Sequence, residues 1–501
     1  MTENLDPITL MQQGKYKEAR EGFKAQLVEE PAAQNAIHFY GMLSIILNDI
    51  ADGITYMSLS LSLAPDNSAY IKNSLQALNL LSHHKHKSAR MLFTQQLKNA
   101  VKNHRASAIS VADYFLKKKK AKSCLEVLAP FTAPSFDVQF YKAIAHQLLT
   151  QKDAAQRAMQ KALTIKPYHP LYNEQTTRRK PKVLLIYALE NLDFHPIIDK
   201  DIAFSIYGGH FDVNKFIDPK TVDIARLFVS DSDNFRNAVK QLGQYDLVIN
   251  CIADMEVCAN ALTLLTQFER FNHDIINPPS AILNTSRVDI YQQLSPLPLK
   301  IAETNIFHGN AQFATYNSGF PALARPLGSS TGIGLVKLQD QQSFDHFLKD
   351  SCGEVLNICP FIDFKSADGL YRKYRVFVID GEIYPEHCVA HNHWNVHSSS
   401  RLTLMKNNDE LRSQEQAFVD DYTSVLSDKH IAVIKEIHSA LQLDYFGIDF
   451  SITPDDELLV FEANAGMRVN SDYVQSFEYL VTPIQRIVNA FKKMIECRIT
   501  T

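Results

Sequence analysis

Hydrophobic and polar positions change their spacing near residue 180. From residue 5 to about residue 174, apolar residues recur at steps of three and four with hardly a β-branched run, which predicts helices throughout. After this region, continuous apolar runs at 181–189 and 245–253 are typical of buried parallel strands, and helical patterns such as 259–271 lie between and after them. The alternation predicts an α/β domain that follows an all-α region.

Near the C-terminus, residues 446–464 form two apolar strands joined by the polar turn 454–457. Side chains alternate faces along a strand, so Glu462 and Asn464 share one face. If the strands pair across the turn, Asp449 reaches the same end of the hairpin. Two carboxylates and an amide oxygen suit Mg²⁺, which takes one or two carboxylates and leaves its other positions to water and phosphates. An ordinary hairpin with solvent-facing carboxylates is the alternative.

The helical region shows an internal repeat. Prolines that end helical patterns are separated by 34, 69 and 33 residues, and they are Pro31, Pro65, Pro134 and Pro167. Two units resemble a tetratricopeptide repeat, through Leu10, Gly14, Tyr16, Ala19 and Phe23 in the first and Leu148, Ala155, Met159 and Ala162 in the last. A period near 34 residues predicts an array of four to five units, which would present a concave surface to a peptide or protein. A plain helical bundle is the alternative.

Residues 320–338 predict a strand, a flexible loop and a second strand. The backbone N–H groups of a glycine-rich loop can approach an anion closely, and Arg325 just upstream offers a fixed cation for a phosphate. The loop residues concerned are Gly328, Ser329, Ser330, Gly332 and Gly334. Further along, Arg375 begins a strand, and Asp380–Gly381 is typical of a hairpin turn.

Length, charge and cysteine usage narrow the class of protein. A chain of 501 residues is too long for one core and indicates two or three domains. Its net charge of −4 argues against nucleic acid or an anionic membrane as partner. Seven cysteines without metal-type spacing indicate free thiols in a reducing compartment, and no apolar run reaches spanning length. We therefore expect a cytoplasmic protein.

Together these motifs resemble those of an ATP-grasp ligase. Five segments between residues 181 and 495 carry the resemblance in the expected order, namely INPPSAILNTSR, LARPLGSSTGIG, CPFI, YRVFVIDGEIYP and GIDF…LVFEANAG. The branch is the one that holds ribosomal-protein glutamate ligases and D-alanine–D-alanine ligases. The resemblance implies a multidomain chain, with a helical repeat domain at 1–174, an α/β pre-ATP-grasp domain at 181–275 and an α+β ATP-grasp domain at 276–501.

The resemblance also implies roles for single residues. Asp449, Glu462 and Asn464 match Mg²⁺ ligands, and the loop 328–334 matches the one that folds over the ATP phosphates. Arg375 matches the arginine that contacts the γ-phosphate or an acyl phosphate. The match to the inter-lobe hinge that reads adenine covers Cys359, Phe361 and Ile362, with Asp363 in reach of the ribose.

The chain departs from this pattern in two places. Arg287 and Arg325 stand where such enzymes usually carry two lysines toward the phosphates. The positive charge is kept, but the compact ammonium group of lysine is replaced by the planar, bidentate guanidinium group of arginine. Cys359–Pro360 replaces the usual acidic residue of the hinge. Arg468, just past Asn464, is a candidate to hold a substrate carboxylate; pairing with a neighbouring acid is its alternative role.

A histidine-rich loop, 391–398, holds the single tryptophan, Trp394. Its position after the Arg375 hairpin indicates substrate contact, with His393 or His397 as a proton acceptor for an amine. A zinc site is the alternative, although the spacing matches no closed ligand set.

The sequence thus predicts an ATP-dependent carboxylate–amine ligase that works through an acyl phosphate, with ATP and Mg²⁺ as cofactors. An amino acid or amine is the expected co-substrate, and the repeats are expected to recruit a peptide or protein. The alternative is a repeat scaffold fused to a catalytically silent nucleotide-binding domain.

Overall fold

A computed structural model describes residues 6–82, 84–172, 180–271, 274–309, 316–329, 332 and 334–500. The chain forms two compact units. The first comprises the residues up to Lys166 together with Phe194–Ser205, and the second comprises Pro167–Asp193 and the chain from Ile206 onward. No helix within the described ranges is both long and apolar enough to cross a membrane.

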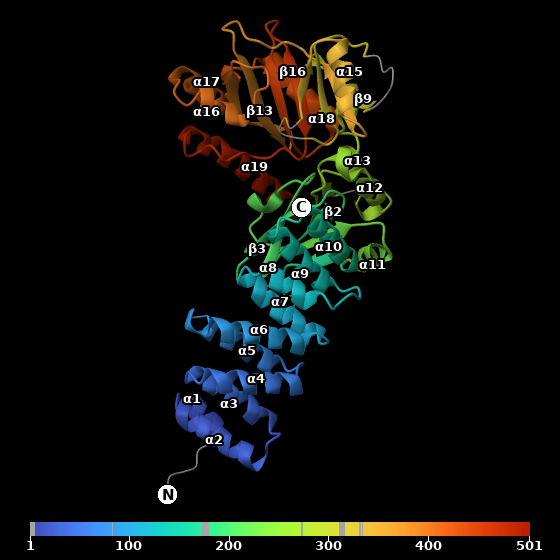
Figure 1. Ribbon diagram of the computed structural model, residues 1–501. Helices are drawn as coiled ribbons and strands as arrows, with labels where there is room; N and C mark the ends of the chain where they lie inside the picture. The colour runs from blue at the N-terminus through green and yellow to red at the C-terminus, as the bar shows by residue number, and fades with distance from the viewer. Residues whose placement is uncertain are drawn as a thin grey trace. The chain divides into compact units, whose positions relative to one another are not determined.

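The first unit is built of successive helices (Figure 1). They are α1 (Pro7–Gln12), α2 (Tyr16–Glu29), α3 (Gln34–Ile46), α4 (Ile50–Leu63), α5 (Ser68–Leu80), α6 (Lys87–Val101), α7 (Arg105–Lys117), α8 (Ala121–Leu128), α9 (Phe136–Leu148) and α10 (Lys152–Ile165). The predicted N-terminal helical region is therefore confirmed. Pro31, Pro65 and Pro167 each follow a helix end by two residues, as expected of a residue that cannot continue a helix.

Glycines allow helices of this unit to cross closely. A Cβ added to Gly41 would lie 2.7 Å from the backbone nitrogen of Met57, and one added to Gly53 would lie 2.4 Å from Ile45. The packed interior beside this crossing is formed by Ala19, Phe23, Ala36, Tyr40 and Leu43. The helices therefore pack as pairs around small and aromatic residues.

Hydrogen bonds link alternate helices of the first unit at a constant spacing. The Tyr70 hydroxyl donates to Asn35 Oδ1 at 2.7 Å, and the Tyr114 hydroxyl donates to Asn79 Oδ1 at 3.0 Å. Each pair is separated by 35 residues. The interval agrees with the period near 34 residues seen in the sequence, while the tetratricopeptide assignment stays a prediction.

The second unit begins with a sheet of order β1-β5-β2-β6-β7. Its strands are β1 (Tyr168–Pro170), β5 (Asp223–Val229), β2 (Lys182–Ala188), β6 (Leu247–Asn250) and β7 (Ile275–Ile276), all parallel except β1 at the edge. Helices α11 (Asp233–Gln241) and α12 (Met255–Thr266) follow β5 and β6. The predicted parallel strands are confirmed. The prediction that the helical region extends to about residue 174 is wrong, because β1 lies within that range and pairs with β5.

A further hairpin, β3 (Asp193–Ile198) and β4 (Ile202–Tyr207), was not predicted. Its residues 194–205 group with the first unit, where Phe204 packs against Phe140 at a ring-centroid distance of 5.9 Å. The division into a separate pre-ATP-grasp domain stays a prediction.

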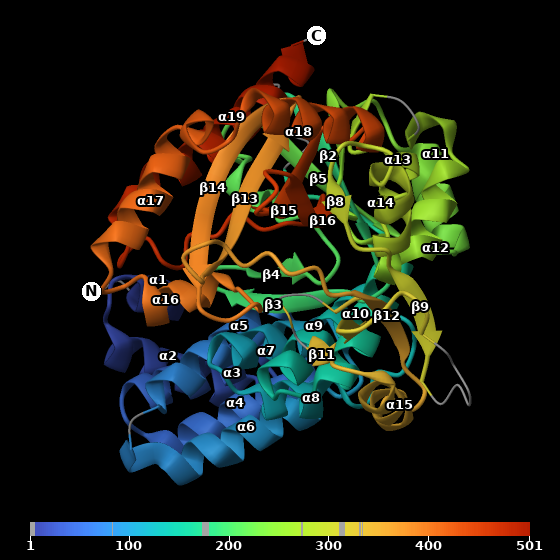
Figure 2. The same ribbon diagram turned by 90° about the horizontal axis from the view of Figure 1, so that it is seen from above.

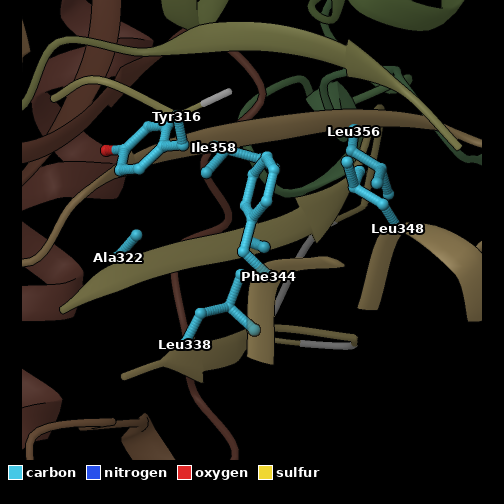
Figure 3. Close-up of a cluster of buried hydrophobic side chains, with 8 residues drawn as sticks. Tyr316, Ala322, Leu338, Phe344, Leu348, Leu356 and Ile358 are labelled. Atoms are coloured by element: carbon cyan, nitrogen blue, oxygen red, sulfur yellow. The ribbon is translucent and has the colours of Figure 1, made fainter. Parts of the chain in front are cut away.

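The next sheet of the second unit has the order β11-β10-β12-β9 and is antiparallel. Its strands are β9 (Asn305–His308), β10 (Ala322–Pro326), β11 (Val336–Leu338) and β12 (Val355–Pro360). Helix α15 (Gln341–Asp350) contributes Phe344 and Leu348 to the core on this sheet, where they meet Tyr316, Leu338 and Ile358 (Figure 3).

The last sheet has the order β14-β13-β15-β16-β8. Its strands are β8 (Lys300–Ile301), β13 (Tyr371–Ile379), β14 (Glu382–His391), β15 (Tyr445–Ile452) and β16 (Leu458–Asn464). Helices α17 (Asp409–Asp420) and α19 (Val481–Thr500) pack against β14 (Figure 2), and α18 (Asp428–Leu441) leads into β15. Both predicted hairpins are present, and positive φ angles at Asp380 and Gly381 (48° and 79°) match the expected tight turn.

Three short helices, α13 (Pro279–Ile282), α14 (Arg287–Leu294) and α16 (Arg401–Leu404), lie in the connections of the second unit. The Ser286 hydroxyl caps α14 by accepting from the Asp289 N–H at 3.1 Å. The cap makes Arg287 the first helical residue, at a fixed position.

Candidate active site

The β15–β16 hairpin brings the predicted metal donors together. Asp449 lies directly opposite Glu462, and Gly447 lies opposite Asn464. Cross-strand partners on one face have Cβ atoms about 5 Å apart. The Asn464 amide donates to Glu462 Oε1 at 3.1 Å, while its oxygen accepts from the Gly466 N–H at 2.5 Å. The convergence predicted from strand alternation is therefore present, and the role of these oxygens as metal ligands stays a prediction.

Asp449 also pairs with two cations on the neighbouring strand β13. Arg375 binds it with both arms, Nε to Oδ1 at 2.5 Å and Nη2 to Oδ2 at 2.9 Å, and Lys373 Nζ lies 3.1 Å from Oδ2. Burial alone would raise the pKa of Asp449, but Arg375 and Lys373 hold it well below its usual range. Asp449 is therefore a permanent carboxylate that is paired with two cations.

Glu386 and His387, which the sequence reasoning did not assign, lie behind this pair. A bulge in β14 leaves Glu386 without a partner on β13, and its Oε2 lies 3.6 Å from Arg375 Nη1 and 3.0 Å from His387 Nδ1. Burial lowers the pKa of His387 to about 4, so the ring is neutral near pH 7. The available signal was a charged residue inside the apolar strand YPEHCVA.

The glycine-rich loop is attached to both predicted arginines. Arg325 Nε donates to Ser329 Oγ at 3.0 Å, and the same guanidinium contacts the Ser329 carbonyl. Arg287 Nη2 donates to that carbonyl at 3.3 Å. Gly328, Gly332 and Gly334 all have φ between 66° and 72°, a left-handed backbone that favours glycine, while Ser330 lies outside the described residues.

Helix α12 adds two carboxylates that the sequence reasoning missed. Glu256 Oε2 lies 2.7 Å from Arg287 Nη1 and accepts from the Gly328 N–H at 2.9 Å. Asp254 caps the helix by accepting from the Glu256 N–H at 2.9 Å. Burial, and then the Glu256 charge, raises the pKa of Asp254 to about 6. No spacing in the sequence links α12 to a loop more than 70 residues downstream.

The predicted hinge lies at the end of β12. Burial raises the pKa of the Cys359 thiol to about 11, while Arg287 and Arg325 act in the opposite direction. Lys337 Nζ, another residue missed in the sequence, lies 3.2 Å from the centroid of the Phe361 ring. Ile362 and Asp363 follow in the connection to β13, and Asp363 Oδ1 accepts from the Lys365 N–H at 3.2 Å.

Of the two candidate histidines, His397 lies beside the glycine-rich loop. A Cβ added to Gly332 would lie 2.7 Å from His397 Nε2. Burial, and then Lys373 and Arg325, lowers the pKa of His397 below its usual value. His393 is exposed, and its Nδ1 accepts from the Asn395 N–H at 3.2 Å. Within the described ranges, no group of three or more His, Cys, Asp or Glu side chains could hold a metal ion.

Arg468 contacts Arg375 through its backbone carbonyl. Its carbonyl accepts from Arg375 Nη1 at 3.4 Å, and its own side chain is exposed. The predicted contact of Arg468 with a substrate carboxylate stays a prediction.

Comparisons with known proteins point to ligases. No family model matches the chain. By sequence, it is 29% identical over 125 residues to the coenzyme γ-F420-2:α-L-glutamate ligase of Methanococcus maripaludis, a match that covers 24% of this chain and 44% of that protein. It is 20% identical over 303 residues to N-acetylaspartylglutamate synthase A of Mus musculus, which covers 57% of this chain and 69% of that protein.

Similar solved structures include D-alanine–D-alanine ligase from Bacillus anthracis, with a TM-score of 0.35, 9% identity and coverage of 62% of this chain and 99% of that chain. An ATP-grasp RimK domain protein from Sphaerobacter thermophilus has a TM-score of 0.34, 13% identity and coverage of 62% and 99%. These scores are low, so the proposal below depends on the side chains of this chain. The relatives found by sequence agree with the predicted resemblance to ligases. The particular relatives found by sequence are a glutamate ligase and an N-acetylaspartylglutamate synthase.

Proposed function

We propose that the second unit is an ATP-dependent carboxylate–amine ligase. The observation that carries the proposal is that carboxylate and cationic side chains from several elements lie together in the second unit. Oxygen donors on β15 and β16 lie beside Arg375 and Lys373, and Glu462 Oε1 lies 3.6 Å from Arg287 Nη2, which links the hairpin to the glycine-rich loop. Catalysed phosphoryl transfer needs this combination of cations, loop N–H groups and metal-binding oxygens.

The donor set fits magnesium. Asp449 and Glu462 are carboxylates and Asn464 supplies an amide oxygen, all hard donors from adjacent strands. Bound there, Mg²⁺ would neutralise charge on the phosphates of ATP. The bidentate Arg375–Asp449 pair fixes the carboxylate before any ligand arrives.

The reaction follows from these side chains. A substrate carboxylate oxygen bonds to the γ-phosphorus of ATP as the bond to ADP breaks, and Arg375 stabilises the phosphoryl oxygens. An amine nitrogen then attacks the acyl carbon, phosphate leaves, and the amine proton passes to His397, whose lowered pKa keeps the ring neutral. The products are an amide, ADP and phosphate.

Phe361 and Lys337 support a place for the adenine at the hinge. An aromatic ring with a cation over its face offers a stacking surface at the end of β12, next to Cys359. Ile362 and Asp363 complete this proposed nucleotide pocket.

For the first unit we propose recruitment of a peptide or protein substrate. The supporting observation is the set of hydrogen bonds at an interval of 35 residues, which favours a stacked repeat array over an irregular bundle. The tetratricopeptide-like positions of the sequence agree with this proposal.

A coupled assay of ADP release with Mg²⁺–ATP and a panel of acids and amines tests the ligase proposal. Because both sequence relatives bear glutamate in their names, L-glutamate is the first amine to include. Calorimetry with Mg²⁺ and ATP provides the control for binding. Absence of ATP uptake at saturating Mg²⁺ would exclude the proposal; ATP uptake without ADP release across the panel would favour the silent nucleotide-binding alternative.

A further inference from the structure

Glu256 collects donors from three separate segments. Its carboxylate accepts from Arg287 Nη1 at 2.7 Å, from the Arg287 N–H at 3.3 Å and from the Gly328 N–H at 2.9 Å. Asn357 Nδ2 on β12 lies 3.2 Å from Oε1. The Glu256 side chain is 5% exposed, so this carboxylate is held inside the protein by the cation and loop that the proposed function assigns to phosphate binding.

These contacts divide the guanidinium of Arg287 into two sides. Nη1 is bound to Glu256, whereas Nη2 lies 3.3 Å from the Ser329 carbonyl and 3.6 Å from Glu462 Oε1. A guanidinium is a rigid plane, so a partner that fixes one nitrogen also fixes the direction of the other. The side that faces Glu462 and the loop is therefore oriented by Glu256.

A lysine at position 287 would behave differently in this environment. Its ammonium is a single point charge, and a buried carboxylate within reach would hold it, because a buried unpaired charge is costly. No second nitrogen would remain for a phosphate. The presence of arginine instead of lysine at this position is thus coupled to the presence of Glu256.

We propose that Glu256 is a positioning residue that occupies one side of Arg287 and so directs the other side toward the nucleotide phosphates. This inference rests on the proposed function. It explains why the chain carries arginine at a position where the ligases that it resembles usually carry lysine. It makes position 256 a determinant of nucleotide affinity although Glu256 itself need not touch the nucleotide.

The test uses the full chain and calorimetric titration with Mg²⁺ and the non-hydrolysable analogue adenylyl imidodiphosphate. We expect Arg287→Lys to weaken binding about tenfold, the loss of one charge-assisted hydrogen bond. In Arg287→Lys combined with Glu256→Gln, the ammonium is no longer captured, and affinity should return to within about threefold of the original chain. A purely structural role for Glu256 would make the double variant worse than either single one.

Glu190→Gln is the matched control. Glu190 Oε2 also accepts a backbone N–H of α12, that of Ala261 at 3.2 Å, rather than a donor of Arg287. We expect this variant to bind the analogue like the original chain. Glu256→Asp is the second variant in case the glutamine disturbs folding, since the shorter carboxylate withdraws from the side chain at position 287 and should also relieve Arg287→Lys.

Failure of both double variants to bind more tightly than Arg287→Lys would overturn the inference. Tighter binding by Glu256→Gln alone would also overturn it, because Glu256 would then be a competitor of the phosphates. Failure of the proposed function gives a different result, because the original chain then does not bind the analogue at all. In that case the inference fails together with the proposed function.

Discussion

Two arginine–carboxylate pairs, one buried and one largely buried, lie on or beside the sheet β14-β13-β15-β16-β8, and only one belongs to the candidate site. Arg375 pairs with Asp449 across β13 and β15, with exposed fractions of 16% and 5% for the two side chains. Arg401 Nη2 lies 2.8 Å from Glu415 on α17, with exposed fractions of 2% and 0%. Burial and pairing are therefore similar in kind, and neither identifies a functional site.

The difference lies in what completes each pair. Glu415 is satisfied by neutral donors, the Tyr479 hydroxyl at 2.6 Å and the Cys388 N–H at 3.1 Å, while Arg401 lies over the Tyr473 ring. Asp449 instead lies among further charged side chains, with the second cation Lys373 on one neighbouring strand and the carboxylate of Glu462 on the other. A pair completed by neutral partners holds a core together, whereas a carboxylate among cations and further carboxylates is suited to a ligand that brings both a metal ion and negative charge.

Asp449→Asn should have the largest effect on activity. Loss of the charge weakens a proposed metal donor and leaves Arg375 and Lys373 without their charged partner. We expect ADP release to fall about a thousandfold, equivalent to about 4 kcal/mol of transition-state stabilisation. Steady-state ADP release measures the change, and retention of most of the activity would remove Asp449 from the site.

Glu415→Ala should separate stability from activity. The substitution removes the acceptor of three buried donors, Arg401, the Tyr479 hydroxyl and the Cys388 N–H, so we expect the free energy of unfolding to fall by about 3 kcal/mol. Urea titration followed by emission of Trp394, the single tryptophan, reports on the second unit. Turnover per folded molecule should be unchanged, and a parallel loss of turnover would contradict the assignment of this pair to the core.

His397→Ala tests whether the candidate site extends to the histidine-rich loop. If His397 accepts the amine proton, turnover should fall about a hundredfold with little change in ATP affinity. His393→Ala in the same loop is the control, because His393 is exposed, and it should leave turnover unaltered. Equal effects of the two substitutions would argue for a general role of the loop.

The parts of the fold that could be predicted are those with local signals. Strand alternation and turn residues located β15 and β16, and the positive φ of Asp380 confirms a turn that the Asp–Gly pair indicated. In contrast, β1 is a three-residue strand that ends in Pro170 and is held by its partner β5. Its conformation depends on tertiary pairing, which overrides the helical pattern of the preceding residues.

The candidate site divides in the same way. Asp449 and Glu462 could be predicted because one hairpin carries both, and alternation decides which face each occupies. Glu256 and Lys337 come from α12 and β11, and only the folded chain brings them to Arg287 and Phe361. A sequence-distant carboxylate that orients a cation leaves no periodic pattern from which it could be inferred.

The smallest expected effect is a difference in the pH dependence of stability between the two pairs. Burial raises the pKa of Glu415, and Arg401 offsets this only in part, so the folded state holds the proton more tightly than the unfolded state. Stability contributed by Glu415 should therefore rise as pH falls through the raised folded pKa, so the stability gap between the original chain and Glu415→Ala should widen on acidification.

Asp449 should show the opposite behaviour. Burial would raise its pKa, but Arg375 and Lys373 lower it further than that, so its carboxylate stabilises the fold at every pH above its unfolded value of about 4. The stability gap between the original chain and Asp449→Asn should stay constant from pH 7 to pH 5 and shrink only on further acidification. Urea titrations at pH 7 and pH 5 measure both gaps. If the stability difference between the original chain and Asp449→Asn already narrows at pH 5, Arg375 and Lys373 do not hold Asp449 ionised. The contrast between the Arg375–Asp449 pair in the candidate site and the Arg401–Glu415 pair in the core would then be lost.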